Sequence, residues 1–402
     1  MDQAHIPKSI KTITLARSIR WFGWGLCETL IPVLLFSLLH NYTEAGLLRS
    51  IYDIVFLLAL PFVSMLGDRI PAKKLILFAL ALYPLIGISY FLAGLLGMTF
   101  FIVLARAING VVWCCDSIGG DTYLRRFASE YHLSKTFGYL HSLPNLTWMI
   151  AALVSIPFLT RIPIYWLFLG ISVTAIIAYF VMSRAPQDEV PIRKNKTSTY
   201  FFNPLKIISG MREWKTEIWT LTFLTFFVAC VDPLGTFFLP LFVYTKSNDL
   251  SHVVIITVIY AIPSTLAFWF GTYIDKVSKW TFVSVSLLVT AVLLGVMSLA
   301  QTYLFQIIGI FILGTLTVCL TLALQALVTK ASRADNYGKV GGLMAGAEQI
   351  GAIVGPITIG LLADIGGTYS TFLTLGTITL VTAVGCFWYK ARHTHEIMVI
   401  SH

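Results

Sequence analysis

The stretch SRAPQDEVPIRKNKTSTYFFNPLKIISGMREWK, residues 183–215, is the longest polar interruption in an otherwise strongly apolar chain. It is rich in Lys, Arg, Pro and Asn, and it has no sustained apolar face. On either side of it the sequence runs as a series of apolar segments of about 20 residues, the length that a helix needs to cross a bilayer. The interruption therefore divides the chain into two parts, each built from candidate membrane spans.

The composition agrees with a membrane protein. Hydrophobic residues make up 57% of the 402 residues, charged residues only 12%, and the mean hydropathy is +0.81. A soluble chain of this length carries about twice that share of charge. The spans must be helical, because a strand in lipid needs a closed barrel and its alternating pattern is absent here.

We predict an all-α membrane protein with twelve transmembrane helices in two six-helix bundles. Residues 1–184 form the N-terminal bundle, 185–215 a cytoplasmic linker and 216–402 the C-terminal bundle. The expected spans are 17–39, 46–66, 75–96, 99–120, 136–158, 163–184, 217–244, 252–273, 281–300, 303–328, 339–363 and 369–390.

The net charge of +9 is a topology signal, as the positions of the basic residues show. With the N-terminus in the cytoplasm, all but four of the 28 Lys and Arg fall at the termini or in cytoplasmic turns. Arg161 and Lys246 lie outside, and Arg49 and Arg106 lie within spans. This is the positive-inside bias, so we expect both termini in the cytoplasm, membrane lipid as the surrounding partner and no binding to nucleic acid.

The two halves repeat. Glu28 and Asp232 are 204 residues apart, and four further pairs share that offset: Gly110 and Gly314, Lys135 and Lys339, Gly138 and Gly342, and Asn145 and Gln349. A recurring offset of this kind is typical of transporters built from internal repeats. We therefore expect the two bundles to be pseudo-symmetric.

The turns SMLGDRIPAKK (64–74) and GTYIDKVSKW (271–280) also correspond. Both resemble the signature of the major facilitator superfamily, in which a Gly, a small spacer and an Asp precede basic residues between spans two and three. The physical sense of such a turn is that an acid at a helix end engages a neighbouring helix N-terminus or basic residue and so holds one conformation. The resemblance implies a conformational latch at Asp68, Arg69, Asp275 and Lys276.

RAING, Arg106 to Gly110, is similar to a pattern that the family often places in span four, and its arginine is implicated in proton coupling in many relatives. The glycine-rich antiporter signature expected in span five is absent, and a comparable run, GAIVGPITIG (351–360), occurs in span eleven. The sequence therefore does not decide between uptake and efflux, or between symport and antiport.

Glu28 and Asp232 lie deep within spans one and seven. An ionised side chain at the centre of a spanning helix costs about 2.5–3.5 kcal/mol on insertion scales, so such residues normally face a cavity or a partner and have a role. Pro233 frees a backbone carbonyl and bends its helix. The resemblance implies that spans one and seven face the central cavity, where both acids would approach the substrate and proton path.

Other charges lie within the spans. Arg49 and Asp53 are one helical turn apart and can pair with each other, while Arg106 lies at a similar depth, so that Asp53 has two candidate partners. Asp116 and Glu348 are the remaining charged residues within the predicted spans.

Five acids against two arginines indicate an acidic interior, which favours protons or a cationic or zwitterionic solute, since a carboxylate in a low-dielectric interior can act as a proton carrier. Trp24, one turn before Glu28 on the same face, is a candidate substrate contact.

The sequence has no phosphate-binding glycine loop, His-Glu-x-x-His run or nucleophile elbow, which argues against an enzyme or a primary pump. The cysteines show no zinc-like pairing with His, and we expect neither a cofactor nor a metal. We predict a monomeric secondary active transporter of the bacterial inner membrane that moves a small solute by alternating access, with proton coupling. The alternatives are an uncoupled facilitator, and a receptor or scaffold that keeps the fold without transport.

Overall fold

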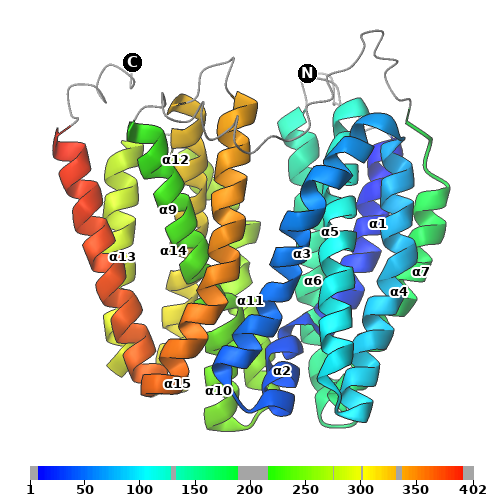
Figure 1. Ribbon diagram of the computed structural model, residues 1–402, viewed down its shortest axis with the longest axis horizontal. Helices are drawn as coiled ribbons and strands as arrows, with labels where there is room; N and C mark the ends of the chain where they lie inside the picture. Colours follow the sequence, from blue (N-terminus) through cyan, green and yellow to red (C-terminus); the bar gives the residue numbers. More distant parts are fainter. Residues whose placement is uncertain are drawn as a thin grey trace. The chain divides into compact units, whose positions relative to one another are not determined.

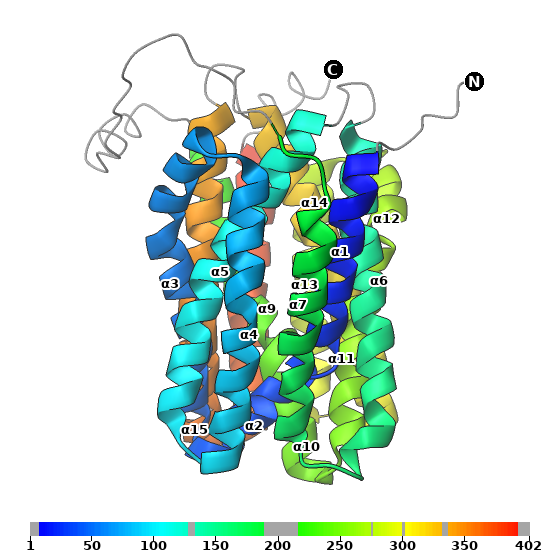
Figure 2. The same ribbon diagram turned by 90° about the vertical axis from the view of Figure 1, so that its right-hand side faces the viewer.

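The computed structural model describes residues 8–127, 133–188, 216–274, 276–299, 302–331 and 337–392 (Figures 1 and 2). Every regular element in these ranges is helical, as the apolar runs predict. Because each backbone group of a helix finds its partner within the same segment, such elements satisfy the requirement of a lipid environment.

The first half of the chain contains long helices joined by short turns. They are α1 (Lys8–Gly25), the 3₁₀ turn η1 (Glu28–Leu30), α2 (Ile31–Leu39), α3 (Tyr42–Arg69), α4 (Ala72–Leu96), α5 (Thr99–Phe127), α6 (Leu133–Leu159), the 3₁₀ segment η3 (Ile164–Phe168) and α7 (Leu169–Ser183). The predicted first span begins at residue 17, whereas α1 begins nine residues earlier at Lys8.

The second half is also built mainly from long helices. It contains α9 (Thr216–Pro233), the π-helical turn η4 (Leu234–Phe238), α10 (Leu239–Ser247), α11 (Leu250–Thr265), α12 (Ala267–Ile274), α13 (Lys279–Leu299), α14 (Tyr303–Ala331) and α15 (Tyr337–Arg392). The 56-residue α15 is interrupted at Gly367, whose φ of 69° is left-handed, and Figure 1 shows that the chain reverses direction there.

Ten helices of the described chain are long and apolar enough to cross a membrane. The difference from the predicted twelve arises in two places. The expected span 252–273 is split into α11 and the short α12. The expected spans 339–363 and 369–390 form the single element α15, with Gly367 between them.

The chain divides into two compact units, and one helix contributes to both. Unit 1 comprises Met1–Leu38 and Ile51–Ser209, and unit 2 comprises Leu39–Ser50 and Gly210–His402. The boundary at Ser50 falls inside the continuous helix α3. The first two turns of α3 therefore belong to unit 2, although they follow directly on the first helices of unit 1.

In unit 1, α4 packs against α5 and α7, and α1 packs against α6 and α7 (Figure 2). Glycines allow the closest approaches. A side chain at Gly23 of α1 would collide with the backbone of Gly170 in α7, and one at Gly87 of α4 would collide with the Phe168 carbonyl. Small residues at helix contacts are what membrane bundles use, because packing drives helix association in lipid.

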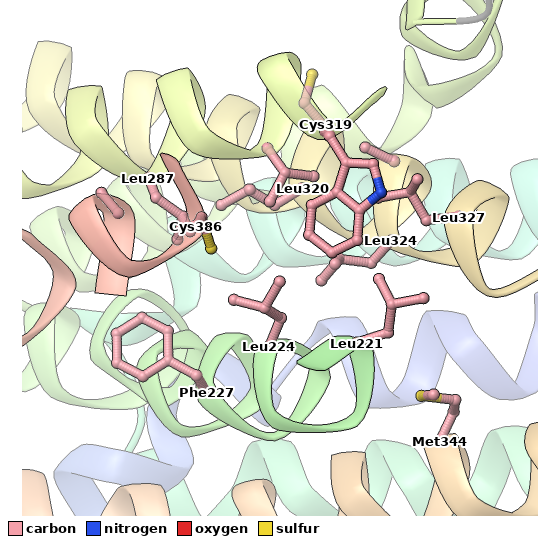
Figure 3. Packing of buried hydrophobic residues seen from close by; sticks show 14 of the residues in the cluster. Leu221, Leu224, Phe227, Leu287, Cys319, Leu320, Leu324, Leu327, Met344 and Cys386 are labelled. Carbon is pink, nitrogen blue, oxygen red and sulfur yellow. The ribbon is translucent and has the colours of Figure 1, made fainter. Parts of the chain in front are cut away.

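The core of unit 2 is formed by α9, α13, α14 and α15 (Figure 3). The side chains that meet there include Leu221, Leu224, Phe227, Leu287, Leu320, Leu324 and Cys386. Large apolar side chains are also exposed on the outside of both units, for example Phe62, Val173, Trp269, Leu299 and Val381. Exposed apolar surface of this extent marks a face that contacts lipid.

Candidate functional site

The first spanning helix breaks at Glu28. Pro32 has no N–H, so it cannot donate to the carbonyl of Glu28 four residues earlier, and its ring crowds that carbonyl. The carbonyl of Glu28 instead accepts from the backbone N–H of Ile31, in the 3₁₀ turn η1. Pro32 thus interrupts the α-helical hydrogen bonding at the position of the Glu28 carboxylate.

Glu28 is half-buried and is held by a tryptophan from α6. The indole Nε1 of Trp148 donates a hydrogen bond of 2.7 Å to Glu28 Oε2. Gly25 permits this contact, because a side chain there would collide with the backbone carbonyl of Trp148 and push α6 away.

The corresponding break in unit 2 lies at Asp232. α9 ends at Pro233, and the chain continues through the π-helical turn η4 before α10 begins. The Asp232 carbonyl accepts a hydrogen bond of 3.3 Å from Thr236 Oγ1. π-Helical turns are frequent at functional sites because they loosen the regular bonding ladder. The predicted bend at Pro233 is present as this turn.

Asp232 is half-buried and is likewise held by an aromatic residue from another helix. Tyr260 of α11 donates a hydrogen bond of 2.7 Å to Asp232 Oδ1. Gly235 makes room for the Tyr260 ring, with which any larger side chain would collide. Glu348 of α15 lies within electrostatic range of Asp232, so unit 2 brings two of the predicted acids together.

A second charged cluster, which the sequence did not indicate, is buried in unit 1. Asp116 of α5 forms ion pairs with Arg20 at 3.0 Å and with Arg17 at 3.4 Å. Arg17 also donates a hydrogen bond of 2.7 Å to the Asp116 backbone carbonyl. The three side chains are 1–8% exposed. Gly120 admits the Arg17 guanidinium, which any side chain there would displace.

Aromatic rings complete the surroundings of Arg20. Its guanidinium donates a hydrogen bond of 2.6 Å to the Tyr83 hydroxyl, and it lies 4.8–5.5 Å from the ring centroids of Trp21, Tyr83 and Trp113. Cation–π contacts of this kind compensate part of the desolvation of a buried cation. Trp24, predicted as a substrate contact, is 6% exposed and packs edge-on against Tyr83.

Arg17 and Arg20 were counted with the cytoplasmic N-terminus, and the structure buries both side chains against Asp116. The predicted excess of acids over arginines within the spans stays a prediction.

Asp53 and Arg106 are buried in unit 1, at 4% and 5% exposure. Gly110 brings their helices together, since a side chain there would collide with the Tyr52 carbonyl of α3. Arg49 is half-buried in the part of α3 that belongs to unit 2. The pairing of Asp53 with either arginine stays a prediction.

The predicted latch residues are only partly described. Asp68 is helical at the end of α3, Arg69 and Lys276 are exposed, and Asp275 lies outside the described residues. Beside this turn, the Asp188 carboxylate caps α4 by accepting from the backbone N–H groups of Ala72 and Lys73, at 2.7 and 3.0 Å.

Within the described ranges, no three His, Cys, Asp or Glu side chains are grouped so that they could hold a metal ion. Glu28 belongs to unit 1 and Asp232 to unit 2, and each is oriented by its own aromatic donor.

Known structures share this fold at low identity. A mutant of the nucleoside transporter NupG has a TM-score of 0.81 at 13% identity, over 94% of this chain and 99% of that chain. A POT family transporter in complex with 5-aminolevulinic acid has a TM-score of 0.77 at 14% identity, over 98% of both chains. The human organic anion transporter MFSD10 has a TM-score of 0.67 at 13% identity, over 95% and 100%. No curated protein sequence matches the chain.

The family comparison covers nearly the whole chain. The model of the Major Facilitator Superfamily matches residues 13–346, with a second match over 254–398. These matches include the helix breaks at Glu28 and Asp232 and every described element from α2 to α14. The chain therefore belongs to the Major Facilitator Superfamily and is a transporter, not an enzyme.

Proposed function

We propose that this protein is a secondary active transporter that moves a small solute by alternating access and couples the movement to protons. The observation that carries the proposal is that each unit breaks its first helix at an acid. Glu28 and Asp232 are each held by one aromatic hydrogen-bond donor at 2.7 Å. A half-buried carboxylate that is oriented by a neutral donor can exchange a proton without losing its position.

The two acids would serve one solute path at the bilayer midplane. Arg106 in α5, together with Asp53 and Arg49, which lie one turn apart in α3, would take part in proton coupling. Trp24 would line the path through a rearrangement of its contact with Tyr83. Asp68, Arg69, Asp275 and Lys276 would latch the cytoplasmic ends; in that case Asp68→Asn changes the cysteine accessibility of the cytoplasmic cavity.

A cationic or zwitterionic solute remains our proposal, now supported by the acids of unit 2 alone. Asp232 and Glu348 are within electrostatic range of each other, and a positively charged group between them relieves the repulsion of two like charges. The POT family transporter with a similar fold binds 5-aminolevulinic acid.

For the membrane topology we propose twelve spans in two six-helix bundles. α11 and α12 together would form one span, and α15 would form two that meet at Gly367. The positive-inside bias supports cytoplasmic termini, and we propose a monomer in the bacterial inner membrane.

Purified protein in proteoliposomes tests the function. A thermal-shift screen against amines, amino acids, peptides and nucleosides first identifies a ligand, because a ligand that binds the folded state raises its unfolding temperature. Flux of that ligand driven by a pH gradient supports proton coupling. Flux indifferent to the gradient indicates a facilitator, and binding without flux indicates a receptor.

Glu28→Gln distinguishes the role of the carboxylate from that of its shape. It should keep the protein folded and abolish gradient-driven flux, because the amide cannot carry the proton. Glu217→Gln, at the first turn of α9, is the matched control. Unchanged gradient-driven flux in Glu28→Gln would rule out the carrier role.

A further inference from the structure

The last turns of α15 present a row of exposed side chains at helical spacing. Val381, Val384, Trp388 and Arg392 follow one another at intervals of three or four residues, so they lie on one face of the helix. Val381, Val384 and Trp388 are 67%, 59% and 57% exposed, and Arg392 is exposed as well. Apolar side chains exposed in a row mark a face that contacts lipid. We call these four residues the α15 outer row.

The outer row ends in an aromatic residue paired with a cation. The guanidinium carbon of Arg392 lies 4.0 Å from the centroid of the Trp388 ring. Membrane proteins place Trp at the level of the lipid headgroups, because its ring is apolar while its N–H is polar. The row therefore changes from apolar to charged at Trp388, in the order in which a bilayer changes from acyl chain to headgroup.

The stacked position of Arg392 keeps its hydrogen-bond donors available. Stacking uses the flat face of the guanidinium, whereas the N–H groups point outward in its plane. Among the residues that the structure describes, no carboxylate forms an ion pair with Arg392. The planar fork of a guanidinium matches two oxygen atoms of a phosphate. Arg392 is therefore suited to bind a phosphate group at the end of the row.

The end of α15 is fixed to the start of α13, as Figure 1 also shows. Tyr389 packs on Trp280 with ring centroids 5.1 Å apart. Lys390 Nζ donates a hydrogen bond of 2.6 Å to Thr281 Oγ1. These contacts hold the last turn of α15, and with it the outer row, in a fixed orientation on unit 2.

The surroundings of the row are basic. α13 begins at Lys279, and the free N–H groups of a helix N-terminus add positive potential. Residues 276–299 and 365–392 contain no Asp or Glu, and Asp275 lies outside the described residues. Each basic residue close to an anionic membrane surface strengthens the attraction between them. The potential beside Arg392 thus favours an anionic partner.

We propose that the α15 outer row binds one anionic phospholipid, with the phosphate at Arg392, the glycerol region at Trp388 and an acyl chain along Val384 and Val381. From Val381 to Arg392 the row is about 16 Å long at 1.5 Å per residue, close to half the hydrocarbon thickness of a bilayer, about 15 Å. A single chain of one leaflet therefore covers it. The inference goes beyond the proposed transport function and does not depend on it.

Quenching by brominated lipid tests the site in the full-length protein in neutral detergent. Bromine on an acyl chain quenches an adjacent indole, and the part of the quenching that Trp388→Leu removes belongs to the outer row. We expect dibrominated phosphatidylglycerol to bind there about fivefold more tightly than dibrominated phosphatidylcholine, the contribution of one basic residue near an anionic lipid. Equal binding of the two lipids, or no quenching that depends on Trp388, would overturn the proposal.

Arg392→Gln tests the phosphate contact. It should abolish the fivefold preference for phosphatidylglycerol at Trp388, because the amide keeps a polar side chain but removes the charge and the fork. Lys246→Gln is the matched control, since it removes an exposed basic residue from the last turn of α10 in the same unit. It should leave the preference unchanged. A preference that survives in Arg392→Gln would show that the lipid is not bound at this residue.

Free phosphate separates a lipid site from a site for the phosphate group alone. Inorganic phosphate, compared with sodium chloride at the same ionic strength, should not displace brominated phosphatidylglycerol, because it lacks the chain that covers Val381 and Val384. Complete displacement by phosphate would show that the row takes the free anion, and the lipid proposal would fail.

Discussion

Trp148 of α6 and Glu28 of η1 are joined by a hydrogen bond from the indole Nε1 to Oε2, 2.7 Å long. The pair recurs in a different chemical form in unit 2, where the hydroxyl of Tyr260 donates to Asp232. In both units a glycine lets the aromatic residue approach, at Gly25 and at Gly235. Each acid is thus oriented by a donor that does not itself titrate in the physiological range.

Trp148→Phe removes the donor to Glu28 and keeps an aromatic ring in its place. We expect ligand flux to fall about tenfold, the size of one hydrogen bond to a charged group, with little change in unfolding temperature. Trp166→Phe, in the half-exposed segment η3, is the control and should behave as the parent protein. Parental flux in Trp148→Phe would mean that Glu28 does not need this donor.

Asp116→Asn leaves the guanidinium groups of Arg17 and Arg20 buried without a counter-charge. Breaking a buried ion pair in this way costs about 3–5 kcal/mol, so the unfolding temperature in detergent should drop sharply. Asp121→Asn, half-buried on the same helix, should have a much smaller effect. Similar unfolding temperatures for the two variants would argue against the cluster as a source of stability.

Gly235→Ala places a methyl group against the ring of Tyr260. Overpacking of this kind costs about 1–3 kcal/mol, and displacement of the ring should also weaken its bond to Asp232. Adding Tyr260→Leu should recover stability but not flux. Gly295→Ala is the control, because nothing lies within 4 Å of a side chain there, and it should stabilise the helix slightly. Loss of stability in both alanine variants would contradict the role of the ring.

Asp188→Ala removes the cap of α4. The free energy of unfolding should fall by about 0.5–2 kcal/mol, as for other helix caps, because the N–H groups of Ala72 and Lys73 lose their acceptor. The neighbouring exposed residue provides the control, Gln187→Ala. Thermal unfolding of the purified variants measures the effect of each substitution. An unchanged unfolding midpoint in Asp188→Ala would show that water replaces the carboxylate cap without loss of stability.

Local pattern was enough to predict the class of fold. Apolar runs identified helical spans, and the membership of the superfamily that the turn at 64–74 suggested is confirmed. The proline beside Asp232 also predicted a change in helix geometry there, which the π-helical turn confirms. These features depend on residues that are close together in the chain, so they can be predicted from a single sequence.

Partners far apart in the chain were not predictable in the same way. Arg17 and Arg20 were counted with the cytoplasmic N-terminus, and their burial was not predicted. A usable signal was present, because Arg17, Trp21 and Trp24 recur at helical spacing along one face of α1. Asp116, the partner of Arg17 and Arg20, comes about a hundred residues later and becomes evident only when α5 is placed beside α1.

The shared helix α3 has a consequence for the order in which the protein is made. Unit 2 needs residues 39–50 and also residues 210–402, which leave the ribosome after the helices of unit 1. Domains made in sequence usually complete their folding as they emerge. Here the second unit cannot be complete until the helices of the second half have been made, because residues 39–50 belong to the same compact unit as those helices.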